Sequence, residues 1–179
     1  TCTQIDLDKL FERGFNTGHG YIRQPNDILS YSALACIALQ SNQNDQHGGQ
    51  SVPMLDFYLA KGVAKTFIKE VVRFLDIRFD FEHVEEIYKE LKEYVKEHKL
   101  IMNKAGKDFI RNIVNKYMLL GHADFNKLIE KATQYTNRQT YQAMEALIHN
   151  LNTMHSRAGA QVPFSSVNYG TDSSEEGRM

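Results

Sequence analysis

Helical periodicity in the middle of the chain constrains its fold more than any other feature. Over 82–99 and 104–120, apolar side chains recur at steps of three and four residues, while Glu and Lys occupy the opposite face. This pattern is typical of helices that bury one side against a core. Similar patterns predict further helices over 28–40, 53–75, 123–133 and 138–154.

Residues that favour helix boundaries support these assignments. Asn26 or Asp27 can cap the first long helix, since both side chains accept hydrogen bonds from free backbone N–H groups. Pro53 suits the first turn of the next helix, and Gly121 suits the end of the helix over 104–120.

The segments that flank the first long helix predict a short strand and two loops. Residues 3–14 begin strand-like and pass into a helical turn that Gly14 ends. Residues 15–25 contain glycines and a proline, and residues 41–52 are almost wholly polar with a glycine pair. We expect both of these segments to be loops.

The last thirty residues, 150–179, are dominated by small and polar side chains. Such a run supplies hydrogen-bond donors and close backbone approach but little apolar surface, which suits the wall of a ligand pocket. Within it, residues 161–168 alternate as a strand. The order strand, helices, strand predicts the α/β class with a helix-rich first half.

Bulk properties exclude several classes of function. The 179 residues can form one domain, and a formal net charge of -1 argues against a general nucleic-acid or anionic-membrane surface. No stretch has the length of a transmembrane helix, and no signal-peptide pattern precedes Thr1.

Two cysteines favour a reducing, cytoplasmic location. Because the chain begins with Thr and stops inside a polar run, we expect it to be truncated at both ends.

The amide-rich run over 41–51 is a candidate ligand contact. Amides both donate and accept hydrogen bonds, which suits base edges and ribose hydroxyls, and Gly48 and Gly49 allow close backbone approach. The alternative is a solvated connector between two helices. So many amides beside a glycine pair favour ligand contact.

A second candidate is the loop that carries His19, Arg23 and Gln24 just before a helix start. Helix N-termini present free N–H groups and a positive dipole end, so this loop suits phosphate binding. Three lysines at i, i+4 and i+8 could meet the same anion: Lys61, Lys65 and Lys69. For the lysines alone, a solvated stripe is the favoured interpretation.

The cysteines and histidines give weaker signals. Cys36 lies on the apolar side of its helix and is assigned to the core, whereas chemistry alone leaves Cys2 undecided between a redox thiol and a small buried side chain. No histidine pair has metal-ligand spacing, so we predict no metal site and interpret five histidines as surface or core residues: His83, His98, His122, His149 and His155.

Three blocks together resemble the anaerobic, class III ribonucleoside-triphosphate reductases, which are glycyl-radical enzymes. They are CTQIDL at 2–7, TGHGYIRQPNDI through SNQNDQHGGQS at 17–51, and LNTMHSRAGAQVPFSSVNYGTDSSEEGR at 151–178. The resemblance covers essentially the whole chain. It implies that residues 1–179 are part of a catalytic domain, a ten-stranded α/β barrel, without the ATP-cone, the radical glycine or the zinc site of the family.

The resemblance also implies a radical mechanism. In that family a glycyl radical generates a thiyl radical on a finger-loop cysteine, which abstracts the ribose 3′ hydrogen, and formate commonly supplies the reducing equivalents. A radical-SAM enzyme activates the full-length protein. Neither the glycine motif nor the finger-loop cysteine lies in this sequence. Cys2 matches the family's second active-site cysteine, which donates a hydrogen atom or proton as the 2′-hydroxyl leaves.

Two ligand sites follow from the same resemblance. The implied contacts to the nucleoside triphosphate substrate are Asn44, His47, Gly48, Gly49, Gln50, Ser51, Arg157, Gln161, Ser165, Ser166 and Asn168. A deoxynucleotide effector is expected between the subunits of a homodimer, on the helices that match 26–40 and 53–75. The effector candidates are Gln24, Asp27, Gln40 and Lys65.

The chain departs from the family pattern at two places. Many relatives have REP where this chain has Arg23-Gln24-Pro25, so a contact that needs the glutamate is in doubt. Many also have TSPEGR where residues 173–178 are SSEEGR, which loosens a turn. Two alternative functions remain: a deoxynucleotide-binding and dimerisation module, and a glycyl-radical enzyme of the formate-lyase type. The amide-rich run argues against the latter.

Overall fold

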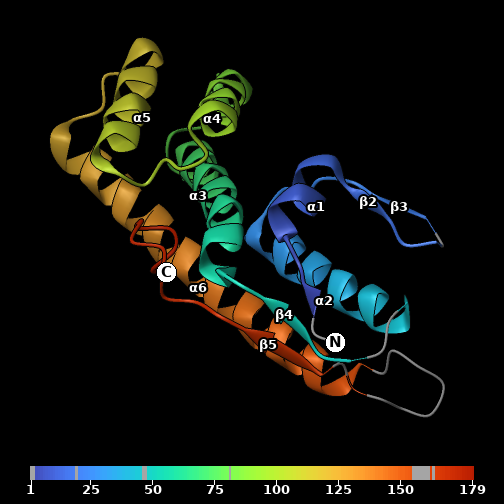
Figure 1. The fold of residues 1–179 in the computed structure, drawn as a ribbon. Helices are drawn as coiled ribbons and strands as arrows, with labels where there is room; N and C mark the ends of the chain where they lie inside the picture. Colours follow the sequence, from blue (N-terminus) through green and yellow to red (C-terminus); the bar gives the residue numbers. More distant parts are fainter. Residues whose placement is uncertain (1–2, 19, 46–47, 81, 155–161, 163) are drawn as a thin grey trace.

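The computed structural model describes residues 3–18, 20–45, 48–80, 82–154, 162 and 164–179. Three long helices pack side by side, with a short parallel sheet beside them (Figure 1). The helices are α1 (Leu7–Arg13), α2 (Ile28–Asp45), α3 (Leu55–Phe79), α4 (Val84–His98), α5 (Lys104–Tyr117) and α6 (His122–Thr153). The strands are β1 (Thr3–Gln4), β2 (Phe15–Asn16), β3 (Tyr21–Ile22), β4 (Gln50–Val52) and β5 (Ser165–Val167).

The core lies where α2 and α3 pack on each other and on α6. Tyr31 and Phe67 are among the largest fully buried side chains. Gly62 allows α2 and α3 to approach closely, because a Cβ there would lie 2.9 Å from the Tyr31 ring. Thr66 joins the same helices through its hydroxyl, which accepts a hydrogen bond from the Ile28 N–H at 2.9 Å.

The three-stranded sheet has the order β1-β4-β5, and both pairings are parallel. Thr3 and Ser165 lie on either side of Gln50 in the ladder. Each parallel connection runs through helices, as parallel pairing requires. The predicted α/β class is therefore confirmed, and the helix-rich composition with it.

The predicted loop over 41–52 is wrong in its first half, because α2 continues to Asp45. Gln43 is buried in the last turn, and its side-chain oxygen accepts a hydrogen bond from Gln50. Tertiary contacts of this kind stabilise a helical conformation that the amide-rich composition alone does not favour. Residues 46–47 lie outside the described residues, and 50–52 form β4.

Other boundaries also differ from the sequence prediction, and α5 ends at Tyr117 rather than at residue 120. Helix α3 begins at Leu55, after a turn that contains Pro53, and it extends to Phe79. Gly121 is the N-cap of α6 rather than the end of α5. The predicted helices over 123–133 and 138–154 are one continuous helix, because no Gly or Pro interrupts residues 134–137.

Within the predicted loop over 15–25, β2 and β3 form a small antiparallel hairpin. Gly18 has a positive φ of 84°, and its N–H donates to the Asn16 side chain at 2.9 Å, so this residue pair makes the turn. Three predictions are confirmed: the helix over 82–99, the helical turn that Gly14 ends, and the burial of Cys36. Searched over the described residues, no helix has the length and apolar character needed to cross a membrane.

Candidate functional site

The predicted substrate residues Ser51 and Ser166 meet in the parallel sheet, beside Gln4, which was not predicted. Ser51 on β4 pairs with Gln4 on β1 and with Ser166 on β5. Paired residues project to the same face of a sheet, so these three side chains share one face. Gln4 and Ser166 are exposed, and Ser51 is half-buried. We name this polar surface, formed by Gln4, Ser51 and Ser166, the open sheet face.

The opposite face of the sheet packs on α2. Gln50 is only 3% exposed, and its side-chain oxygen accepts a hydrogen bond from Asn42 at 2.7 Å. Its side-chain nitrogen donates to the Leu39 carbonyl at 2.8 Å. The Gln50 amide is thus committed to contacts within the chain, and it ties β4 to the last turns of α2.

The remaining substrate candidates that the structure describes lie on different elements. Asn44 is exposed in the last turn of α2, and Asn168 is exposed just after β5. Gly48 has a positive φ of 117°, and the Gly49 carbonyl accepts the Thr3 N–H at 3.1 Å. Four predicted site residues lie outside the described residues: Cys2, His47, Arg157 and Gln161.

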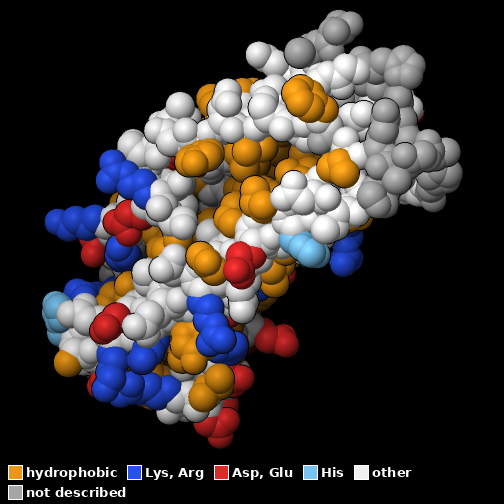
Figure 2. Space-filling view, turned by 90° about the horizontal axis from the view of Figure 1, so that it is seen from below, with side chains coloured by type: hydrophobic (Ala, Val, Ile, Leu, Met, Phe, Trp, Pro, Cys, Tyr) orange, Lys and Arg blue, Asp and Glu red, His pale blue; other side chains and the backbone are white. Residues whose placement is uncertain are grey.

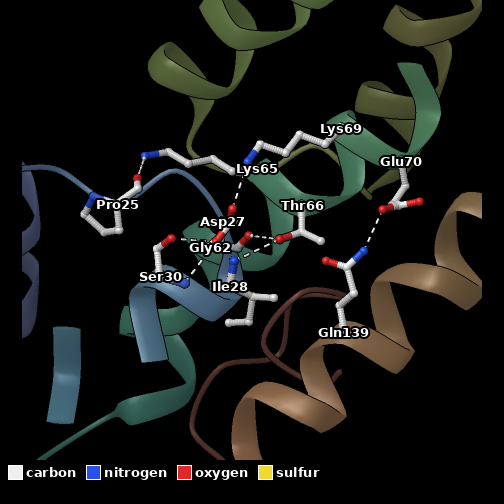
Figure 3. Close-up of polar contacts among 10 residues, drawn as sticks. All are labelled: Pro25, Asp27, Ile28, Ser30, Gly62, Lys65, Thr66, Lys69, Glu70 and Gln139. Atoms are coloured by element: carbon white, nitrogen blue, oxygen red, sulfur yellow. Dashed lines mark hydrogen bonds and ion pairs between the residues drawn. The ribbon is translucent and has the colours of Figure 1, made fainter. Parts of the chain in front are cut away.

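A second polar cluster lies at the opposite end of α2, where this helix begins beside α3 (Figure 3). Asp27 accepts hydrogen bonds from the Ser30 N–H and hydroxyl, and its other oxygen pairs with Lys69 at 2.8 Å. Lys65 donates to the Pro25 carbonyl at 2.8 Å. Burial raises the pKa of Asp27, but the contacts with Lys69 and Ser30 outweigh it and lower the pKa overall.

Beside this cluster, a groove of about 950 Å³ runs between the start of α2, α3 and α4. Gln24 and Asn26 contribute to its lining. Its charged lining consists of seven cations and three carboxylates: Arg13, Lys61, Lys65, Lys89, Lys92, Lys96 and Lys99, against Glu12, Glu85 and Glu93. We name it the basic groove. The excess of positive charge gives it the electrostatic character of an anion site.

Lys65 is the most perturbed cation of the basic groove. Burial, followed by the positive charges of Lys61, Lys92 and Lys69, lowers its pKa from 10.5 to about 8, against the opposing effect of Asp27. A like-charge cluster destabilises each charged member, so a bound anion is stabilised there by relieving the repulsion.

The predicted effector residues do not all meet. Gln24 and Lys65 line the basic groove, and Asp27 directly follows the lining residue Asn26 and interacts electrostatically with Lys65. Gln40 follows Asp27 by thirteen residues, which corresponds to about 20 Å along a helix. The structure therefore places Gln40 towards the sheet end of α2, away from the other three candidates.

A comparison with models of known protein families shows which family the chain belongs to. The family model for anaerobic ribonucleoside-triphosphate reductase matches residues 1–179. The chain belongs to the anaerobic ribonucleoside-triphosphate reductase family. The resemblance carried by the three sequence blocks is thereby confirmed over the full length. A search of curated proteins found no match.

Two features of this reductase-family chain were missed by sequence reasoning. The lysines over 82–107 were interpreted as a solvated face, although three from α4 and its C-cap residue line the basic groove: Lys89, Lys92, Lys96 and Lys99. Asp56 accepts three backbone hydrogen bonds from residues 170–172, and no local pattern marks it. Within the described part of the chain, no group of three or more His, Cys, Asp or Glu side chains could hold a metal.

Proposed function

We propose that the chain forms part of the catalytic barrel of an anaerobic ribonucleotide reductase, which converts ribonucleoside triphosphates to deoxyribonucleotides. The family match, which spans residues 1–179, supports the reaction class. It also favours this reaction over that of a formate-lyase type enzyme. Further strands of a ten-stranded barrel would continue the sheet beyond β1 and β5, which are its edge strands among the described residues.

Exposed apolar side chains support the proposal that more protein covers this segment. Phe164 and Tyr169, on either side of β5, are 80% and 77% exposed. Figure 2 shows hydrophobic side chains gathered in a hollow on one face of the molecule, with Lys and Arg concentrated towards one end. A monomer rarely exposes a large contiguous apolar patch to water, so a longer chain or a second subunit suits this face.

The observation that carries the substrate assignment is the parallel register of β1, β4 and β5. It places Gln4, Ser51 and Ser166 from three distant segments on the open sheet face. Hydroxyl and amide groups bind ribose hydroxyls without fixed charge. Cys2 directly precedes β1 in the sequence, so a thiol donor beside the bound ribose follows from the proposal.

The chemistry that the chain's own residues perform is binding, orientation and hydrogen donation. The family's glycyl radical and formate supply the radical and the reducing equivalents, and their sites, like the structural zinc, are expected outside this chain. A radical-SAM activating enzyme is the expected partner, and a cytoplasmic homodimer the expected assembly.

Anaerobic reduction of an isotope-labelled ribonucleoside triphosphate by the activated full-length enzyme tests the proposal. The wild type should form labelled deoxyribonucleotide, and the Cys2→Ala variant should lose this activity while the protein still folds. Cys36→Ala is the matched control, because that thiol is buried in the core. Wild-type turnover by Cys2→Ala would refute the role of Cys2.

The basic groove favours a second function of the same segment, the binding of a deoxynucleotide effector. Its lysines suit a triphosphate, and Gln24 offers an amide that can contact a base. Titration calorimetry of deoxynucleotides into the dimeric protein tests this function. Lys65→Gln and Gln24→Ala should weaken binding, and Gln40→Ala serves as the distant control. Equal loss in Gln40→Ala would place the effector elsewhere.

A further inference from the structure

Asp56, in the first turn of α3, holds the chain segment that follows β5. Its Oδ2 atom accepts hydrogen bonds from the N–H groups of Gly170, Thr171 and Asp172 at 2.8, 2.8 and 2.9 Å. Three consecutive backbone N–H groups that converge on one oxygen form an anion-binding nest. Here the Asp56 carboxylate occupies the nest. Because the bonds involve only backbone N–H groups of residues 170–172, they do not depend on the side chains of that segment.

The charge of Asp56 strengthens these bonds. Burial raises the pKa of Asp56, but the N–H groups of Asp172, Gly170, Phe57 and Thr171 outweigh it and hold the pKa below its usual value. Its position in the first turn of a helix also favours the negative form. Hydrogen bonds to an ionised acceptor are stronger than neutral ones.

The fixed segment continues directly from the substrate side of the sheet. The Asn168 N–H donates to the Val52 carbonyl at 3.0 Å, and the Asn168 carbonyl accepts the Leu55 N–H at 2.7 Å. Asn168 therefore lies between the end of β4 and the start of α3, where it contacts Leu55, the residue before Asp56. Its side chain is exposed.

A second carboxylate anchors the far end of the same segment. Glu176 is 2% exposed, and its Oε1 atom accepts the N–H groups of Ile101 and Met102 at 2.8 and 2.7 Å. Directly after Glu176, Gly177 packs on Asp172, where a Cβ would lie 2.5 Å from the carboxyl group. Residues 168–179 are thus held at both ends, and Asp56 is the anchor nearer to the open sheet face.

We propose that Asp56 is a positioning residue of the substrate site, which acts through Asn168 by fixing the backbone turn that ends β5. The inference rests on the proposed function, because it assigns Asn168 to the substrate. It assigns Asp56 no contact with the nucleotide and no part in the chemical step.

The test uses the activated full-length enzyme and compares Asp56→Asn with Asp124→Asn, a control that removes a carboxylate from an exposed ion pair with Arg78. Hydrogen exchange should become at least tenfold faster for the amides of 170–172 in Asp56→Asn and stay unchanged elsewhere. The KM for the ribonucleoside triphosphate should rise about tenfold, with a small change in kcat. The control should alter neither.

A double-mutant cycle separates positioning from general stability. If Asp56 acts through Asn168, adding Asp56→Asn to Asn168→Ala should raise KM no further than Asn168→Ala alone. Additive effects, or faster exchange across the whole protein, would overturn the inference. If the wild-type enzyme reduces no nucleotide, the proposed function fails, and unchanged exchange at 170–172 would independently refute the Asp56 anchor.

Discussion

Lys65 shows how position, rather than residue type, decides the chemistry of a side chain. Its spacing with Lys61 and Lys69 is that of a solvated helix stripe, and the sequence favoured that interpretation. In the structure, Lys61 pairs with Asp8 at 2.5 Å, Lys69 pairs with Asp27, and Lys65 is left facing a groove rich in other cations. The surrounding helices, which a local pattern does not reveal, make this difference.

The pH dependence of anion binding tests the state of Lys65. Its pKa of about 8 means that the amine loses its proton above this pH in the nucleotide-free protein, and a bound triphosphate should restore the charge. Binding at pH 8.5 should therefore take up a proton, and affinity should fall as pH rises through 8. Calorimetry in buffers of different ionisation enthalpy measures this uptake. Equal uptake by Lys65→Met would show that another group titrates.

The same pKa shift fixes the sign of a stability effect. Because the folded pKa of Lys65 lies below the unfolded value of 10.5, the unfolded chain binds more protons between pH 8 and 10.5. The Lys65 contribution to the free energy of unfolding therefore increases as pH rises through this window.

Thr66 is a residue at which a conservative substitution should reduce stability. Its hydroxyl accepts the Ile28 N–H and donates to the Gly62 carbonyl, and the side chain is 1% exposed. Thr66→Val leaves a buried N–H without a partner, so we expect a loss of about 1–3 kcal/mol in the free energy of unfolding. Thr133→Val is the control, because its half-buried hydroxyl donates only within its own helix. Denaturant titration compares them, and equal losses would contradict the account.

At the scale of elements, amphipathic helices could be predicted and their ends could not. Ile87, Leu91 and Val95 are buried as the α4 pattern requires. The extension of α2 to Asp45 depends on contacts with Gln50, seven residues away from Gln43, and therefore escapes a local pattern. In α6, the buried hydroxyls of Thr136 and Thr140 donate to carbonyls four residues earlier, so the polar middle of the helix satisfies these groups within the helix itself.

The short strands were harder to predict than the helices. Strands of two or three residues carry almost no periodicity, so β1 and β4 are defined by pairing rather than by composition. The resemblance to a family predicted which polar segments form the site, while only the structure showed that Gln50 faces α2 and Ser166 faces outward. Asp56 has partners more than a hundred residues away, so no sequence window contains both.

Close packing of α2 on α3 makes Gly62 intolerant of substitution. The added methyl group of Gly62→Ala would lie 2.9 Å from the Tyr31 ring and force the helices apart. Overpacking costs about 1–3 kcal/mol, and the better helix propensity of Ala offsets about 1 kcal/mol of this. We expect a lower thermal midpoint. Gly121→Ala, where no atom lies within 4 Å, should change it little, and a higher midpoint for Gly62→Ala would contradict the packing argument.

At the scale of the whole molecule, α2 separates two polar sites with different chemistry. Its first turn borders the basic groove, and its last turns carry the amides that hold β4 and thereby support the open sheet face. Eighteen helical residues correspond to about 27 Å between these ends. The proposed functions therefore predict two nucleotides on this segment, a substrate beside the sheet and an effector beside the lysines.

A crystal structure of the full-length reductase with a ribonucleoside triphosphate and a deoxynucleotide tests this arrangement most directly. The account predicts the substrate ribose against Ser51 and Ser166 and the effector triphosphate among the lysines of the basic groove. A substrate ribose bound in the basic groove, with the open sheet face covered only by protein, would contradict it.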